Sequence, residues 1–246
     1  MNGLRFDATV QQLLDAVLTR SKVRAHFCTV ATLVAAADDG RLRAVLNSAE
    51  VVAADGMPVV WLARRQRRDA ERVCGPDVTP ALADRGRALG LRHYFYGGAP
   101  GVPVRLAEEM ARQYPGIQVA GSHSPPFRTL TAAEDEAIVR MINDARPDVV
   151  WIGLGSPKQE FWAADHQARL DAPVILAVGA AFDFHSGTVN RAPRLLQRAG
   201  LEWLFRLASE PRRLWRRYTI TNLRFAWLVA TDFVRSHARP RGTRPS

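Results

Sequence analysis

The sequence lacks the usual features of secreted, membrane-spanning and metal-binding proteins. It has only two cysteines, Cys28 and Cys74, and neither belongs to a CxxC or Cys/His pattern. This predicts reduced structural thiols in a cytoplasmic protein and no metal site. The chain has no stretch of 18 apolar residues, and no basic start followed by an apolar run and a small-residue cleavage site. We therefore expect neither a membrane-spanning helix nor a secretory signal.

Nucleotide-binding fingerprints are missing as well. No Gly-x-Gly-x-x-Gly follows the first predicted strand, and no Walker Gly-Lys-Ser/Thr sequence occurs, which argues against a nucleotide-dependent oxidoreductase and a P-loop enzyme. The 246 residues are 47% hydrophobic and 24% charged. That is enough apolar material for the core of one large α/β domain or two small ones.

Charge is distributed unevenly along the chain. Residues 1–190 contain 21 basic and 21 acidic side chains, whereas residues 191–246 contain 13 arginines and 3 acids, so this last segment carries the whole net charge of +10. Such a distribution predicts a neutral body and a basic C-terminal segment attracted to a membrane surface, a phosphate-rich substrate or nucleic acid.

Apolar strand-like runs alternate with helical patterns, which predicts an α/β, Rossmann-like fold with a mostly parallel sheet and helices on both faces. We expect strands at 25–30, 50–54, 93–96, 118–121, 149–154 and 174–178, and helices at 7–21 (with Asp7 as N-cap), 32–47, 57–72, 77–89, 102–114, 131–145 and 157–170. Ligands of such sheets bind beyond the carboxyl ends of the strands.

One of these strand ends has the pattern of a phosphate site. Gly155 follows the strand at 149–154, Ser156 is the predicted N-cap, and Gln159 completes a predicted capping box. A helix that starts there presents free N–H groups and its positive dipole end to a phosphate. The same residues are equally compatible with an ordinary helix start.

Two carboxylates follow other predicted strands. Asp55 comes directly after the strand at 50–54 and can act as a general base for a sugar hydroxyl, although Asp-Gly is also an ordinary turn. Asp183 lies with His185 in a predicted loop at 179–187, where it can accept a hydrogen bond from a ribose or sugar hydroxyl or cap its own loop.

Together these blocks resemble a known family. The segments 47–56, 75–77, 95–101, 114–116, 153–160, 179–187, 191–193, 200–207 and 210–218 are similar in order and spacing to the WecG/TagA/CpsF glycosyltransferases, and the resemblance spans roughly residues 6–220. It implies an inverting, metal-independent enzyme without a cofactor. Such an enzyme moves an N-acetylmannosamine-type sugar or glucuronate from a UDP donor to a polyprenyl-diphosphate-linked saccharide.

The resemblance also assigns residues. It implies that Asp55 is the base and that Thr29 shares the catalytic site, while Ala31 stands where the family usually has Asn. The residues assigned to donor binding are Gly155, Ser156, Gln159, Asp183 and Arg191.

The basic C-terminal segment is the expected acceptor and membrane contact. Its C-terminal arginine cluster, Arg212, Arg213, Arg216 and Arg217, has helical spacing and is expected to bind the acceptor diphosphate, although a solvated helix face explains the same spacing. The apolar helix expected at 220–234 suits an anionic membrane surface, and it also suits docking on the core or in a homo-oligomer interface.

We therefore expect a glycosyltransferase core at 1–195, a basic helical appendage at 196–235 and a disordered tail at 236–246. The protein is expected to be cytoplasmic and peripheral on the inner face of the cell membrane. The alternative function is an anionic-surface or nucleic-acid binding protein that uses the basic segment, but no known nucleic-acid motif is present, so we expect no nucleic-acid partner.

Overall fold

The computed structural model describes residues 5–66, 68–198 and 200–238. The chain divides into two compact units, the body, Met1–Arg191, and the C-terminal unit, Ala192–Ser246.

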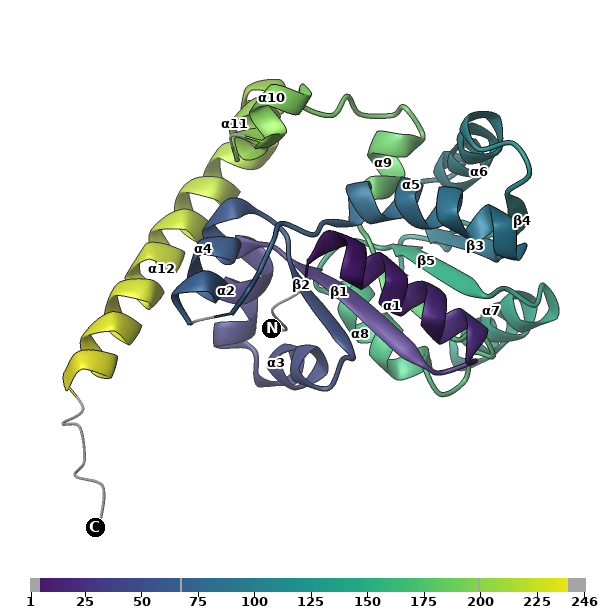
Figure 1. Cartoon of the computed structure of the whole chain (residues 1–246), viewed down its shortest axis with the longest axis horizontal. Coiled ribbons are helices and arrows are strands. Elements are labelled where there is room, and N and C mark those ends of the chain that lie inside the picture. Colours follow the sequence, from purple (N-terminus) through teal and green to yellow (C-terminus); the bar gives the residue numbers. More distant parts are fainter. Residues whose placement is uncertain (1–4, 67, 199, 239–246) are drawn as a thin grey trace, which may run out of the picture. The chain divides into compact units, whose positions relative to one another are not determined.

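A parallel sheet lies at the centre of the body (Figure 1). Within the described residues it has six strands in the order β2-β1-β6-β5-β3-β4, and every neighbouring pair is parallel. The strands are β1 (Val23–Cys28), β2 (Val51–Ala54), β3 (Arg92–Gly97), β4 (Gln118–His123), β5 (Val149–Gly153) and β6 (Val174–Ala177). The predicted α/β, Rossmann-like fold is confirmed.

Helices cover both faces of this sheet. One face packs against α1 (Phe6–Leu18), α5 (Gly75–Gly86), which continues into the short η1 (Arg87–Leu89), α6 (Val102–Gln113) and α9 (Ala181–His185). The other packs against α2 (Val30–Asp38), α3 (Gly40–Asn47), α7 (Ala132–Asp144) and α8 (Lys158–His166). A further helix, α4 (Met57–Arg65), packs with α2 over the end of β2.

The central strands are largely apolar because both faces are covered, although β1 also buries Arg24 and His26, and the edge strand β4 is more polar and partly exposed. In β1, Ala25 and Phe27 enter the core under α1 and α5, whereas Cys28 enters the core under α2 and α3. In β5, Trp151 points to the first of these cores and Ile152 to the second. Successive side chains of a strand point to opposite faces, so a doubly covered strand is a continuous apolar run.

Several predicted helix limits are wrong. The helix expected at 32–47 is two helices, because Asp39 has an extended backbone and its side chain accepts hydrogen bonds from the N–H groups of Arg41 and Leu42. The first helix begins at Phe6 with Arg5 as its N-cap, so Asp7 is not the cap. The helix expected at 57–72 ends at Arg65.

The C-terminal unit is helical. It contains α10 (Arg194–Arg198), α11 (Glu202–Ser209) and α12 (Pro211–Ala238). Residues 236–238, which we expected to be disordered, belong to α12, and residues 239–246 lie outside the described residues. Among the described helices, none combines the length and the hydropathy that a bilayer span requires.

Candidate active site

The carboxyl ends of the strands bring Thr29 and Asp55 together. Cys28, the last residue of β1, is the register partner of Ala54, the last residue of β2. The next residue on each strand is Thr29 and Asp55, and the backbone N–H of Asp55 donates to the carbonyl of Cys28 at 2.9 Å. The two residues assigned to catalysis are therefore neighbours at one edge of the sheet.

Thr29 begins a helix at this edge. It is the N-cap of α2, and its Oγ1 accepts a hydrogen bond from the backbone N–H of Thr32 at 3.2 Å. This bond holds the Thr29 hydroxyl at the positive end of the α2 dipole. Ala31 lies in the first turn of the same helix.

Asp55 is half-buried, and its negative charge contributes to raising the pKa of two buried thiols. Burial, and then the charges of Glu160 and Asp55, raise the pKa of Cys28 to about 12. Burial, followed by the charges of Asp55 and Asp77, also raises the pKa of Cys74. Both thiols are free and protonated at neutral pH, so they are structural groups beside the carboxylate and are poor nucleophiles.

The start of α8 differs from the predicted capping box. The helix begins at Lys158, Pro157 is its N-cap, and no side chain caps it. Gln159 is 5% exposed, and its Nε2 donates to the carbonyl of Ala177 at 3.3 Å and to Oε1 of Glu160 at 3.4 Å. Gln159 therefore connects the first turn of α8 to the end of β6, whereas Gly155 and Ser156 remain exposed.

Glu160 is buried directly beneath this edge. Its side chain is 1% exposed, and burial raises its pKa despite hydrogen bonds from Gln159 and Ser156. Within the described residues, neither Oε2 of Glu160 nor Oε1 of Gln159 has a hydrogen-bond partner. A Cβ at Gly179 would lie 3.2 Å from that Gln159 oxygen, so the glycine leaves room for it. Two unsatisfied polar atoms thus lie under the carboxyl ends of β5 and β6.

Arg191 is held by an ion pair with Asp77. Its Nη1 lies 2.6 Å from Oδ1 of Asp77, while Oδ2 of Asp77 accepts from Sγ of Cys74 at 3.0 Å and lies 3.5 Å from Arg72. The guanidinium also lies over the ring of Phe184, 6.0 Å from its centroid. These contacts connect Arg191, the last residue of the body, to α5. The first residue of α5, Gly75, packs closely against Val178, which follows β6: a Cβ at Gly75 would lie 2.9 Å from Val178.

The segment 179–187 contains a short helix where we expected a loop. Asp183 lies in the first turn of α9 and is half-buried. Its carbonyl accepts from the N–H of Val189. His185, the last residue of α9, has its Nε2 2.8 Å from the carbonyl of Pro76.

Comparison with known proteins identifies the family. The family model described as "Glycosyl transferase WecG/TagA/CpsF family" matches residues 1–239. The chain belongs to this glycosyltransferase family. A curated relative, the N-acetylglucosaminyldiphosphoundecaprenol N-acetyl-β-D-mannosaminyltransferase of Bacillus spizizenii, is 34% identical over 178 residues, which are 72% of this chain and 67% of the relative. The resemblance drawn from the sequence blocks is confirmed.

Family membership makes the carboxyl edge of the sheet the candidate active site of this glycosyltransferase. Thr29, Asp55, Gly155 and Gln159 all lie at or directly beyond the ends of β1, β2 and β5. The functional assignments of these residues stay predictions.

Sequence reasoning missed Glu160 and Asp77. The buried positions of α8 are Gln159, Glu160, Ala163 and His166; the spacing of three residues from Glu160 to Ala163 and from Ala163 to His166 was the available signal that Glu160 faces inward. Asp77 lies in one of the segments that resemble the family, but its pairing with Arg191 had no local signal, because the two residues are 114 positions apart.

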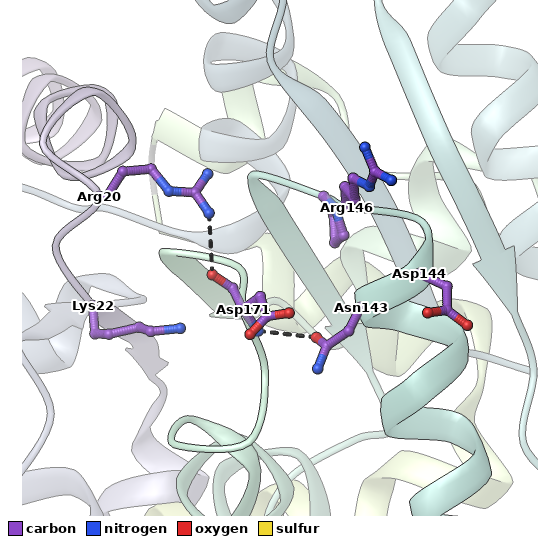
Figure 2. Close-up of a pocket in the computed structure, with 7 residues that line it drawn as sticks. Arg20, Lys22, Asn143, Asp144, Arg146 and Asp171 are labelled. Carbon is purple, nitrogen blue, oxygen red and sulfur yellow. Dashed lines mark hydrogen bonds between the residues drawn. The ribbon is translucent and has the colours of Figure 1, made fainter.

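A cavity of about 750 Å³ lies at the opposite, amino-terminal edge of the sheet (Figure 2). Two of the cations that line it, Arg20 and Lys22, bind protein groups. Arg20 bonds to Asp148 at 3.1 Å and to the carbonyl of Asp171 at 3.4 Å, and Lys22 donates to the carbonyls of Leu170 and Ala172. These bonds tie together the loops that precede β1, β5 and β6, so we assign this cavity a structural role.

Among residues 5–66, 68–198 and 200–238, no group of three His, Cys, Asp or Glu side chains is arranged to hold a metal ion.

In the C-terminal unit, all four members of the C-terminal arginine cluster fall in the first turns of α12, and the side chains of Arg212 and Arg216 are exposed. The same unit exposes several large apolar side chains, namely Leu201, Trp203, Leu204, Trp215, Ile220, Leu223 and Trp227.

Proposed function

We propose that this glycosyltransferase transfers an N-acetylmannosamine-type sugar from a UDP donor to a polyprenyl-diphosphate-linked saccharide, with inversion and without a metal. The observation that carries the proposal is the juxtaposition of Thr29 and Asp55 on neighbouring parallel strands of a chain in this family. The name of the Bacillus spizizenii relative favours the mannosamine-type sugar over glucuronate, the other sugar that the sequence left open.

Asp55 is the proposed general base. It removes the proton of the acceptor hydroxyl while the oxygen attacks the anomeric carbon from the face opposite the leaving UDP, which inverts that centre. The Thr29 hydroxyl, held at the start of α2, orients the reacting sugar by hydrogen bonding.

The start of α8 is the proposed site for the donor diphosphate. Because α8 has no side-chain cap, the positive end of its dipole can face the charge that develops on UDP as the bond breaks, although the N–H of Gln159 already donates to the carbonyl of Gly155 at 3.0 Å. Gly155 and Ser156 lead into this turn, and Gln159 supports it from below. Asp183 would accept a bond from a donor hydroxyl, and Arg191 would face the donor while paired with Asp77.

The C-terminal unit is the proposed contact for the lipid-linked acceptor. The C-terminal arginine cluster would bind the acceptor diphosphate, since guanidinium groups make paired hydrogen bonds to phosphate oxygens. The exposed tryptophans of α11 and α12 suit the headgroup region of an anionic leaflet. The protein would then be peripheral on the inner face of the cell membrane.

The experiment is a screen of UDP-sugars with a short-chain polyprenyl-diphosphate acceptor, in which release of UDP and the glycosylated lipid are measured with and without EDTA. Asp55→Asn should lower turnover by about 10²–10⁴-fold, because general-base catalysis typically contributes that much, and should leave UDP affinity unchanged. Asp144→Asn, an exposed aspartate at the amino-terminal edge, is the matched control. If Asp55→Asn keeps half the wild-type turnover, the base lies elsewhere.

A further inference from the structure

The helix that follows Asp55 exposes a tryptophan. One side of α4 packs into the body through Val59, Val60 and Ala63, which are fully buried. On the opposite side, Trp61 is 60% exposed, and Arg65, one turn further along, is exposed as well. Helix α4 lies beside α2 at the β2 edge of the sheet (Figure 1), and its buried side packs against Ala54 and Val30, which are next to the two catalytic candidates.

The same segment concentrates positive charge within an otherwise neutral body. Residues 57–68 contain four arginines and no acidic residue. The next acids, Asp69 and Glu71, both form ion pairs with Arg5, at 3.7 and 2.9 Å. The side chains of Arg65 and Arg68 are exposed. The balanced total charge of residues 1–190 therefore conceals a local cationic surface.

Packing does not account for the exposure of Trp61. Arg64 stabilises the chain after α4, because its Nε donates to the carbonyl of Ala70 at 2.8 Å, but Trp61 keeps more than half of its surface in water. Tryptophan and arginine side by side on an exposed helix face have the chemistry of membrane interfaces, where the indole lies among headgroups and the guanidinium pairs with lipid phosphates.

We infer that Trp61, Arg65 and Arg68, here called the α4 face, form a second contact with an anionic phospholipid surface, in addition to the one proposed for the C-terminal unit. This inference rests on the proposed function, because an enzyme that uses a lipid-linked acceptor must work at the membrane surface. One weak contact gives marginal and reversible membrane binding, whereas two give stable anchoring. Trp61 lies about 6 Å along the helix axis from Met57, so a contact there brings the edge that holds Asp55 close to the lipid phosphates.

The test is sedimentation of the full chain with vesicles of phosphatidylglycerol and phosphatidylcholine, compared with phosphatidylcholine alone. The triple variant Trp61→Ala, Arg65→Gln, Arg68→Gln should bind the anionic vesicles at least tenfold more weakly than the wild type. The control variant Phe127→Ala, Arg140→Gln, Arg146→Gln removes one exposed aromatic and two exposed arginines elsewhere on the body and should bind like the wild type. The single variants Trp61→Gln and Arg65→Gln should each show part of the loss, and their unchanged thermal unfolding verifies that the fold is intact.

Turnover with a short-chain acceptor in detergent separates this inference from the proposed function. The α4-face variants should keep wild-type turnover there, because no membrane is involved. Equal vesicle binding by the wild type and the triple variant would overturn the inference, as would loss of turnover with the soluble acceptor, which would place the α4 face in substrate binding. A wild-type chain that transfers no sugar would refute the proposed function and leave the vesicle result standing by itself.

Discussion

Replacement of Asp77 by asparagine tests whether its ion pair with Arg191 stabilises the body. Asp77 accepts hydrogen bonds from Arg191 and from Cys74, and Arg72 lies 3.5 Å away. Asparagine keeps the size of the side chain but removes its charge, so Arg191 loses its counter-ion while its side chain is only 19% exposed. We expect a less stable body.

The magnitude follows from burial and partners. A hydrogen bond to a charged group contributes about 1.5–3 kcal/mol, but the Asp77 side chain is 34% exposed, and solvent screening reduces the expected loss to about 1–2 kcal/mol. For a body of this size, that loss lowers Tm by about 2–8 °C. Asp84→Asn, which breaks an exposed pair with Arg87 on the same helix, should cost less than about 0.5 kcal/mol.

The pH dependence gives a second measurement. Burial raises the pKa of Asp77, but the hydrogen bonds and charges of Arg191, Cys74 and Arg72 outweigh it, so the pKa lies below its usual value. The stabilisation is therefore complete above the unfolded pKa of about 4 and is lost as pH falls through the lower pKa of the folded protein. Urea unfolding should show a constant difference between wild type and Asp77→Asn from pH 7 to 5, and a shrinking one below pH 4. Equal stability at pH 7, or a difference that does not shrink in acid, would refute the reasoning.

Three further predictions concern the site and the basic segment. Gln159→Ala should raise the Kd for UDP about tenfold in titration calorimetry. It should also reduce the free energy of unfolding by about 1–2 kcal/mol, because it removes the hydrogen bond to Ala177. Unchanged UDP affinity in a folded variant would contradict the phosphate site. Gly153→Ala should cost about 1–3 kcal/mol or more, since its Cβ would lie 2.5 Å from the ring of Phe182, and Gly40→Ala, where nothing approaches closer than 3.7 Å, is the control. Glutamine at all four positions of the C-terminal arginine cluster should weaken transfer even to a soluble acceptor, with lysine rescuing only in part; normal turnover with lost vesicle binding would make the cluster a membrane contact alone.

The strands could be predicted because their signal is local. Val149–Gly153 is an apolar run between polar segments, and burial on both faces requires such a run. The strand order could not be predicted, because pairing of β1 with β6 joins residues about 150 apart in the sequence. The break at Asp39 had a local signal, Asp-Asp-Gly, which the helical periodicity of the flanking residues concealed.

The site was predicted in part for the same reason. Asp55 and Thr29 come directly after strands, so the parallel topology determines their neighbourhood once the strands are known. The pairing of Asp77 with Arg191 depends on tertiary packing. No window of the sequence contains both partners of such a contact.

The start of α8 differs from the prediction in a way that changes how the hypothetical phosphate site would work. A capping box would have joined the N–H of Gln159 to the Ser156 side chain and the N–H of Ser156 to the Gln159 side chain. In the structure Gln159 points inward to Ala177, and no side chain caps the helix. The N–H of Gln159 donates instead to the carbonyl of Gly155 at 3.0 Å, so the proposed diphosphate site would use the positive end of the α8 dipole and the exposed turn at Gly155 and Ser156. The amide of Gln159 then acts from beneath the turn, which is why we expect its loss to change both UDP affinity and stability.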